Sequence, residues 1–182
     1  MKKIAGLLLV AVLLNTTVTA QFNKAQLQAS GLTCALCTKA IDNALKKISF
    51  VESVAPNIKT SSFTIFFKKD AAVDADALRV AVEDAGFFIS KLQLTGSFSN
   101  IPVKNDTHVT VDGKTFHFIN TKEQILNGEQ TITLVDKLFV PAKQFKKMST
   151  ATTHTCLQTG KAAACCEKVG ADKNARIYHV TI

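Results

Sequence analysis

The alternation of strand-like and helix-like hydrophobic patterns between residues 24 and 95 is the feature that most limits how this chain can fold. Apolar and polar residues alternate in Lys24–Ala29, which predicts a strand with one buried face. From Cys34 to Ile48 the apolar residues take the spacing of a helix, and the pair Lys46-Lys47 suits its last turn, where the helix dipole favours cations. The segment therefore begins with a strand followed by a helix.

The rest of this segment continues the alternation. Phe50–Ala55 and Ser62–Phe67 have the composition of strands, and Phe87–Leu94 predicts a further one. Between them, Asp74 can cap a helix that ends near Gly86, a residue suited to a left-handed C-terminus. The order strand-helix-strand-strand-helix-strand predicts an α+β, ferredoxin-like βαββαβ domain over residues 24–95.

The remaining residues follow a different pattern. Residues 96–105 contain Gly96, Asn100 and Pro102 and are interpreted as a linker. Residues 106–182 are expected to form a small, mostly-β module that resembles a partly open barrel. Its expected elements are a hairpin of His108–Val111 and Thr115–Ile119 around Asp112-Gly113, strands at Gln130–Val135 and Arg176–Ile182, and a short helix or irregular crossing at Val140–Met148.

The first twenty residues have the organisation of a secretory signal peptide. Lys2 and Lys3 precede the apolar run Ile4–Leu14, and Val18-Thr19-Ala20 provides the small residues that signal peptidase requires. The alternative of a membrane anchor is disfavoured because the apolar run is too short to span a bilayer. We expect export to the periplasm or secretion from a bacterium, and no membrane association after cleavage of residues 1–20.

The charge pattern gives no support for nucleic-acid binding. The net charge is +8, but the lysines are dispersed in pairs such as Lys68-Lys69 and Lys146-Lys147, without interleaved aromatic residues. A mildly basic secreted protein accounts for this composition.

The most specific chemical signal is Cys34 and Cys37 at the junction of the first strand and the first helix. A helix N-terminus presents unpaired N–H groups and a partial positive charge, both of which stabilise a thiolate. Two thiolates with no oxygen or imidazole nearby favour a soft ion, and Cu(I) is the natural candidate. Zinc would require four ligands. Such an open, two-coordinate site is suited to passing an ion to a partner.

Two other interpretations of the same pair remain open. An oxidising compartment favours a disulfide between Cys34 and Cys37. A redox-active pair of the thioredoxin kind is the functional variant, although Ala35-Leu36 replaces the usual glycine and proline between the cysteines. Metal binding requires that a reductant, or the metal itself, keeps the pair reduced.

The stretch Gly31-Leu32-Thr33-Cys34-Ala35-Leu36-Cys37 resembles the metal loop of the heavy-metal-associated domain family. That family includes copper chaperones and the metal-binding repeats of copper-transporting ATPases, and its loop carries methionine where this chain has Leu32. Ala85-Gly86-Phe87 is similar to the turn that places an aromatic residue near the loop. The resemblance implies Cys34 and Cys37 as metal ligands, Leu32 and Phe87 as support for the loop, and a metal-transport or metal-accepting protein as partner. With the signal, the chain also resembles the periplasmic mercury-binding protein of mercury resistance.

A second group of possible ligands lies at His154, Cys156, Cys165 and Cys166. A set of three thiols and one imidazole can hold zinc or Cu(I). The alternative is a disulfide between Cys156 and one member of the Cys165-Cys166 pair. At least one of the chain's five cysteines must stay outside any intrachain disulfide.

The other histidines are interpreted as surface or partly buried residues. His108 and His117 are nine positions apart with a turn between them, so the spacing does not predict that they share a face, and His179 lies alone in the last strand.

No catalytic signature accompanies these groups. The chain has no serine-nucleophile motif, no phosphate-binding glycine loop and no zinc-hydrolase motif. We therefore expect a non-enzymatic, exported protein that binds a soft metal and delivers or sequesters it. The alternatives are a periplasmic thiol-disulfide oxidoreductase that uses the same two cysteines, and a non-catalytic interaction protein.

Overall fold

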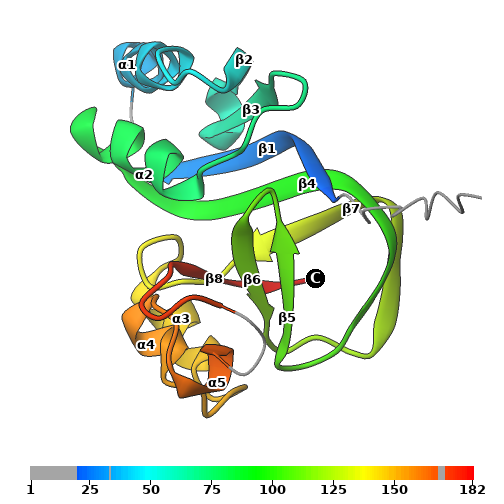
Figure 1. The fold of residues 1–182 in the computed structure, drawn as a ribbon. Coiled ribbons are helices and arrows are strands. Elements are labelled where there is room, and N and C mark those ends of the chain that lie inside the picture. Colours follow the sequence, from blue (N-terminus) through cyan, green and yellow to red (C-terminus); the bar gives the residue numbers. More distant parts are fainter. Residues whose placement is uncertain (1–19, 33, 168–170) are drawn as a thin grey trace, which may run out of the picture.

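The computed structural model describes residues 20–32, 34–167 and 171–182, so nearly all of the predicted signal peptide lies outside the described residues. Within that part of the chain, eight strands form one sheet in the order β2-β3-β1-β4-β7-β8-β6-β5 (Figure 1). The strands are β1 (Gln21–Ser30), β2 (Val51–Asn57), β3 (Ser62–Phe67), β4 (Phe88–Val103), β5 (Thr107–Val111), β6 (Lys114–Phe118), β7 (Gln124–Leu134) and β8 (Ile177–Thr181). The helices are α1 (Ala35–Lys46), η1 (Ile58–Thr60), α2 (Ala75–Asp84), α3 (Ala142–Met148), α4 (Cys156–Thr159) and α5 (Ala164–Glu167).

The N-terminal half confirms the predicted ferredoxin-like βαββαβ order. Its four strands are antiparallel neighbours in the order β2-β3-β1-β4, and α1 and α2 contact each other and the sheet. The predicted helical faces are buried, with Ile41 and Leu45 from α1 and Leu78 and Val82 from α2 all inaccessible to solvent. Burial of each such side chain contributes about 1.5–3 kcal/mol, so these faces fix the helices on the sheet.

Local signals set the ends of α2. The carboxylate of Asp74 accepts hydrogen bonds from the backbone N–H groups of Asp76 at 2.9 Å and Ala77 at 3.3 Å, as an N-cap does. Gly86, with φ of +87°, provides the left-handed residue after the helix.

The local structure of residues 96–105 differs from the predicted linker, because β4 continues without interruption to Val103. Gly96 is a close-approach position. A Cβ at this position would lie 2.9 Å from Phe22 Cα and closer still to Gln21 O, so a side chain would collide with the backbone of β1. Asn100, with φ of +51°, lies in a register shift between Phe98 and Ile101. The residues that suggested a linker therefore belong to a tightly packed, bulged strand.

β4 belongs to both halves of the chain. It pairs with β1 through residues 88–97 and with β7 through residues 93–103. The sheet thus passes from the N-terminal half into the C-terminal half through hydrogen-bonded strands. The division of the chain into domains at residues 95 and 106 stays a prediction.

The C-terminal half contains the predicted hairpin, in which β5 and β6 flank Asp112 and Gly113, both with positive φ. β8 runs parallel to β6 and antiparallel to β7, and so joins the hairpin to the main sheet. Since β2 and β5 end the sheet in the described part of the chain, the strands curl without closing a barrel (Figure 1). The segment between Val140 and Met148 forms α3, while α4 and α5 were not predicted.

Candidate metal centres

The loop before α1 holds Cys34 and Cys37 at the helix N-terminus, as the spacing predicted. Cys34 is the N-cap residue, with extended backbone, and the backbone N–H of Cys37 donates a hydrogen bond to Cys34 Sγ over 3.2 Å. Cys34 is exposed and Cys37 is half-buried. An N–H group without a helical partner thus points at sulfur, an arrangement that favours the thiolate once the pair is reduced.

The two cysteines are bonded as a disulfide in this structure, with their Cα atoms 5.3 Å apart. The disulfide is one of the alternatives that the spacing left open. Metal chelation requires the same proximity of the two sulfur atoms, so ligation of a metal by the reduced pair stays a prediction.

Leu32 and Phe87, the two residues that the resemblance implies as support for the loop, both lie beside it. Leu32 is partly buried against the main hydrophobic core. Phe87 Cδ1 lies 3.9 Å from the position of a Cβ built on Gly31, so its ring contacts the loop. Two apolar side chains near the loop face solvent, Leu36 with 79% and Phe88 with 67% of its surface exposed.

The four histidines of the chain form one cluster in the C-terminal half. His108 and His117 are direct partners across the β5–β6 hairpin, and their rings stack with centroids 4.1 Å apart. The spacing along the chain left open whether they share a face, and the strand pairing places them on the same one. A two-residue turn pairs residues that are equally distant from it, and paired residues project to the same face of a sheet.

Two further histidines complete the cluster. His179 in β8 is the parallel partner of His117, with ring centroids 5.1 Å apart. His154, just before α4, lies with its ring 5.1 Å from that of His117. Cys156 Sγ lies 3.5 Å from His117 Nδ1 and 3.3 Å from His179 Nε2.

Two carboxylates orient the buried imidazoles. Asp106 Oδ1 lies 3.1 Å from His117 Nε2, and Asp136 Oδ1 lies 2.9 Å from His179 Nδ1. Each carboxylate contacts one nitrogen of its imidazole and leaves the other nitrogen directed toward Cys156 Sγ. Burial, reinforced by the neighbouring histidines, lowers the pKa of His117 to about 3 despite the nearby Asp106 carboxylate. His117 is therefore neutral near pH 7, with one nitrogen able to act as a ligand.

In the described part of the chain, three residues of the predicted second group are connected through Cys156, which lies beside His154 and shares an apolar cluster with Cys166. His154 and Cys156 meet, but their neighbours are His108 and His117. Cys166 is buried in an apolar cluster with Cys156, and the side chain of Cys165 lies outside the described part. His108, His117 and His179 were missed as members, although the symmetric spacing about Asp112-Gly113 could have identified the first two.

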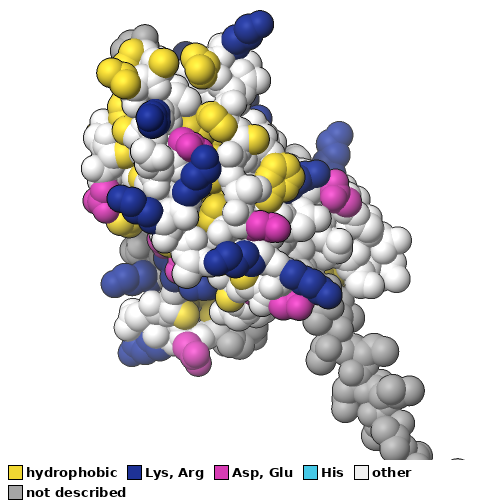
Figure 2. Space-filling model, turned by 90° about the horizontal axis from the view of Figure 1, so that it is seen from above, with side chains coloured by type: hydrophobic (Ala, Val, Ile, Leu, Met, Phe, Trp, Pro, Cys, Tyr) yellow, Lys and Arg dark blue, Asp and Glu magenta, His cyan; other side chains and the backbone are white. Residues whose placement is uncertain are grey.

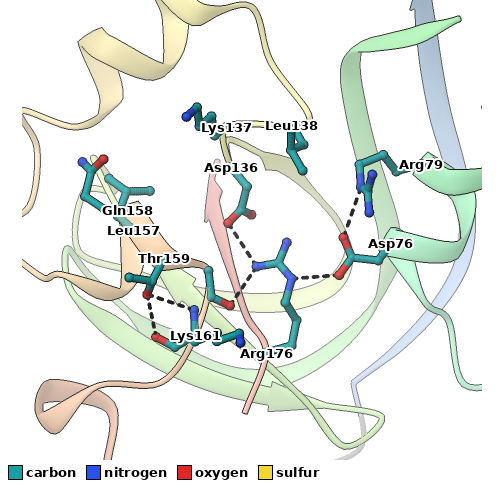
Figure 3. A pocket seen from close by; sticks show the side chains of 11 residues that line it. Asp76, Arg79, Asp136, Lys137, Leu138, Leu157, Gln158, Thr159, Lys161 and Arg176 are labelled. Carbon is teal, nitrogen blue, oxygen red and sulfur yellow. Dashed lines mark hydrogen bonds and ion pairs between the residues drawn. The ribbon is translucent and has the colours of Figure 1, made fainter. Parts of the chain in front are cut away.

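A pocket of about 430 Å³ beside this cluster is organised by Arg176 (Figure 3). The guanidinium donates to Asp76 Oδ2 over 2.8 Å and to Asp136 Oδ1 over 3.3 Å, and it lies 4.3 Å above the Tyr178 ring. Asp76 belongs to α2, so Arg176 joins the two halves. Asp136 is shared between Arg176 and His179, which connects the pocket to the histidine cluster.

The surface adds no sign of a nucleic-acid interface on the face that Figure 2 shows. Lysine and arginine side chains are scattered over this face with acidic side chains between them. Among the described residues, no helix combines the length and the apolar character needed to cross a bilayer.

Comparison with known families identifies the N-terminal half. Residues 26–88 match the family model of the heavy-metal-associated domain. This segment is a heavy-metal-associated domain. The resemblance carried by the loop and the Ala85-Gly86-Phe87 turn is thereby confirmed.

Two curated relatives and two solved structures each match between 36% and 40% of the chain. Copper-transporting ATPase 1 of Rhizobium meliloti (strain 1021) is 33% identical over 67 residues, which are 37% of this chain and 8% of the relative. Copper-transporting ATPase 2 of the same strain is 36% identical over 66 residues, 36% of this chain and again 8% of the relative. The chain thus spans a small fraction of the length of these relatives.

Two solved structures illustrate the similarity. A CopZ metallochaperone is 26% identical, with a TM-score of 0.34, and the match covers 36% of this chain and 97% of that one. Oxidized MerP from Ralstonia metallidurans CH34 is 28% identical, with a TM-score of 0.35, and the match covers 40% and 96% of the two chains.

Proposed function

We propose that the protein is an exported, non-catalytic metal-binding protein that holds Cu(I), or a similar soft ion, between Cys34 and Cys37. The observation that carries this proposal is the hydrogen bond from the Cys37 N–H group to Cys34 Sγ at the start of α1, within a heavy-metal-associated domain. Two thiolates bind Cu(I) strongly because both are soft ligands. The disulfide must first be reduced, which takes two electrons and two protons from an external reductant.

The proposed role is to deliver or sequester the ion. Cys34 is exposed, so a thiolate of an acceptor can bind the ion before the first ligands leave. Exposed Leu36 and Phe88 provide apolar surface for contact with that acceptor. We propose a metal-transport or metal-accepting protein as partner, since the two curated relatives are copper-transporting ATPases. The signal-like N-terminus supports a periplasmic or secreted location.

A Cu(I) titration tests this assignment. The reduced chain is titrated anaerobically against a chromophoric Cu(I) chelator, in a Cys156→Ser background that removes the sulfur in contact with His117 and His179. We expect one tight equivalent, which a further Cys34→Ser/Cys37→Ser substitution abolishes. Cys166→Ser in the same background is the matched control, because it removes a buried cysteine away from the loop, and it should keep the tight site. Retention of this equivalent without Cys34 and Cys37 would disprove the assignment.

The disulfide in the structure favours a second candidate, a thiol-disulfide oxidoreductase that uses the same pair. An oxidoreductase would exchange its disulfide rapidly with a substrate thiol and cycle between both states. Measurement of the reduction potential and of the exchange rate with reduced glutathione distinguishes the two functions. Rapid exchange combined with weak Cu(I) binding would favour the oxidoreductase.

A further inference from the structure

We propose that His108, His117, His154 and Cys156 form a second metal site, which binds a four-coordinate divalent d-block ion such as zinc(II). The site shares no residue with the Cys34–Cys37 pair. It lies at the β5 end of the sheet, between the β5–β6 hairpin, β8 and the segment leading into α4, whereas the cysteine loop follows β1. Imidazole is a borderline ligand and thiolate a soft one, and a set of three imidazoles and one thiolate suits tetrahedral zinc better than the soft ion proposed for the two-thiolate loop.

The distances fit a tetrahedral ion. One ligand atom from each of the four residues lies within 4.8 Å of all the others. A tetrahedral zinc with usual bond lengths places nitrogen and sulfur ligands about 3.6 Å apart, and two nitrogens about 3.3 Å apart. His117 Nδ1 and Cys156 Sγ, at 3.5 Å, are already at the first separation. Small side-chain rotations of His108 and His154 would close the remaining distances.

Two nitrogen atoms of the cluster lack a hydrogen-bond partner among the described residues. His108 Nε2 and His154 Nδ1 are both buried, and His154 Nδ1 stays 3.9 Å from Asp106 Oδ1, beyond hydrogen-bonding distance. An unsatisfied buried polar atom costs about 1–3 kcal/mol, so native proteins rarely keep two side by side without a compensating role. An ion at the centre of the cluster would satisfy both.

The surroundings of the cluster resemble those of known metal ligands. Asp106 accepts a hydrogen bond from Thr152 Oγ1 over 2.6 Å and holds Nε2 of His117, which leaves His117 Nδ1 for the metal. Carboxylate groups behind metal-bound histidines fix the ring in this way. On the opposite side, His179 is held by Asp136 and lies 3.3 Å from Cys156 Sγ, so we assign it as a positioning residue for the sulfur.

The scaffold is rigid on one side and accessible on the other. His117 and Cys156 have no exposed surface, and the strand pairings of β5, β6 and β8 fix the histidines that they carry. The side chain of His154 is 28% exposed and provides the route by which an ion could enter.

Cobalt(II) and zinc(II) titrations of the full chain test the site. The chain carries Cys34→Ser/Cys37→Ser, so that the thiolate pair cannot bind and the outcome is independent of the first proposal. Under reducing conditions we expect one equivalent of cobalt, with the intense d–d bands of four-coordination and a thiolate-to-cobalt charge-transfer band. Cys156→Ser should abolish the charge-transfer band. Cys166→Ser, the matched buried cysteine, should leave it unchanged.

A variant that keeps the fold separates ligation from stability. His154→Ala alters a partly exposed residue outside any helix or strand, and it should weaken zinc binding at least about tenfold while the far-ultraviolet circular dichroism stays unchanged. The proposal is overturned if no stoichiometric site is found, if the band survives Cys156→Ser, if Cys166→Ser removes it, or if His154→Ala binds zinc like its parent.

Discussion

Replacement of Gly96 by alanine tests the close contact between β4 and the start of β1. The backbone of Gly96 is not left-handed, so alanine can adopt its conformation, and the cost arises from contact alone. The added Cβ would lie 2.9 Å from both Gln21 C and Phe22 Cα, against an ordinary separation of 3.4 Å or more. These neighbours are backbone atoms that cannot rotate away, so the two strands must separate.

The expected loss of stability follows from these contacts. Overpacking that requires backbone movement costs about 3 kcal/mol at the upper end of the usual range. Alanine recovers about 0.5–1 kcal/mol, because it has less conformational entropy in the unfolded chain than glycine. The net loss is therefore about 2 kcal/mol, which lowers the Tm of a chain of this length by about 4–8 °C.

Thermal unfolding followed by circular dichroism and by calorimetry provides the assay. Ser97→Ala, at the adjacent exposed position, is the control and should change the free energy of unfolding by less than about 0.5 kcal/mol. Because β4 is shared by both halves, Gly96→Ala should shift a single transition. An unchanged Tm would refute the close contact, and a shift confined to one of two transitions would refute the shared strand.

Two other substitutions test the N-cap of α2 at Asp74 and the ion pairs of Arg176, which join the two halves. Asp74→Ala removes the N-cap of α2 and should cost about 1 kcal/mol in urea unfolding at pH 7, whereas Asp84→Ala at the exposed end of the helix should cost little. Burial raises the pKa of Asp74, but hydrogen bonds from Lys114 and the Tyr178 hydroxyl outweigh it and hold the pKa below its ordinary value of 3.8. The difference in free energy of unfolding between wild type and Asp74→Ala should therefore persist above pH 4 and diminish as the pH falls further. Arg176→Met leaves the buried Asp136 carboxylate without its cation and should lower the free energy of unfolding by about 3 kcal/mol. Lys161→Met, which changes another residue lining the same pocket, is the control and should have no comparable effect.

The sequence was most informative where structure depends on neighbouring residues. The helical spacing of Ile41 and Leu45, the cap at Asp74 and the left-handed Gly86 are local signals, and each was found where it was predicted. The position of Cys34 at the helix N-terminus followed from the same reasoning.

Long-range pairing explains what could not be predicted. Gly96 has the composition of a linker residue, and only the proximity of β1 shows why glycine is needed there. His117 meets His179 because β8 inserts beside β6, a parallel pairing between segments about sixty residues apart that no local pattern encodes. The histidine cluster is therefore a product of topology, and its members look unrelated along the chain.

The pairing of β7 with β4 also determines which sides of the heavy-metal-associated domain other proteins can reach. In a four-stranded βαββαβ unit β4 would be an edge, with unpaired N–H and C=O groups that could extend the sheet into a second molecule. Here β7 covers that edge from Gln93 onward, and the opposite edge strand, β2, contains Pro56, which lacks an N–H group to donate. Sheet extension along this part of β4 is thus closed to a second molecule, whereas the N-terminus of α1 stays accessible, because Cys34 and Leu36 are exposed there.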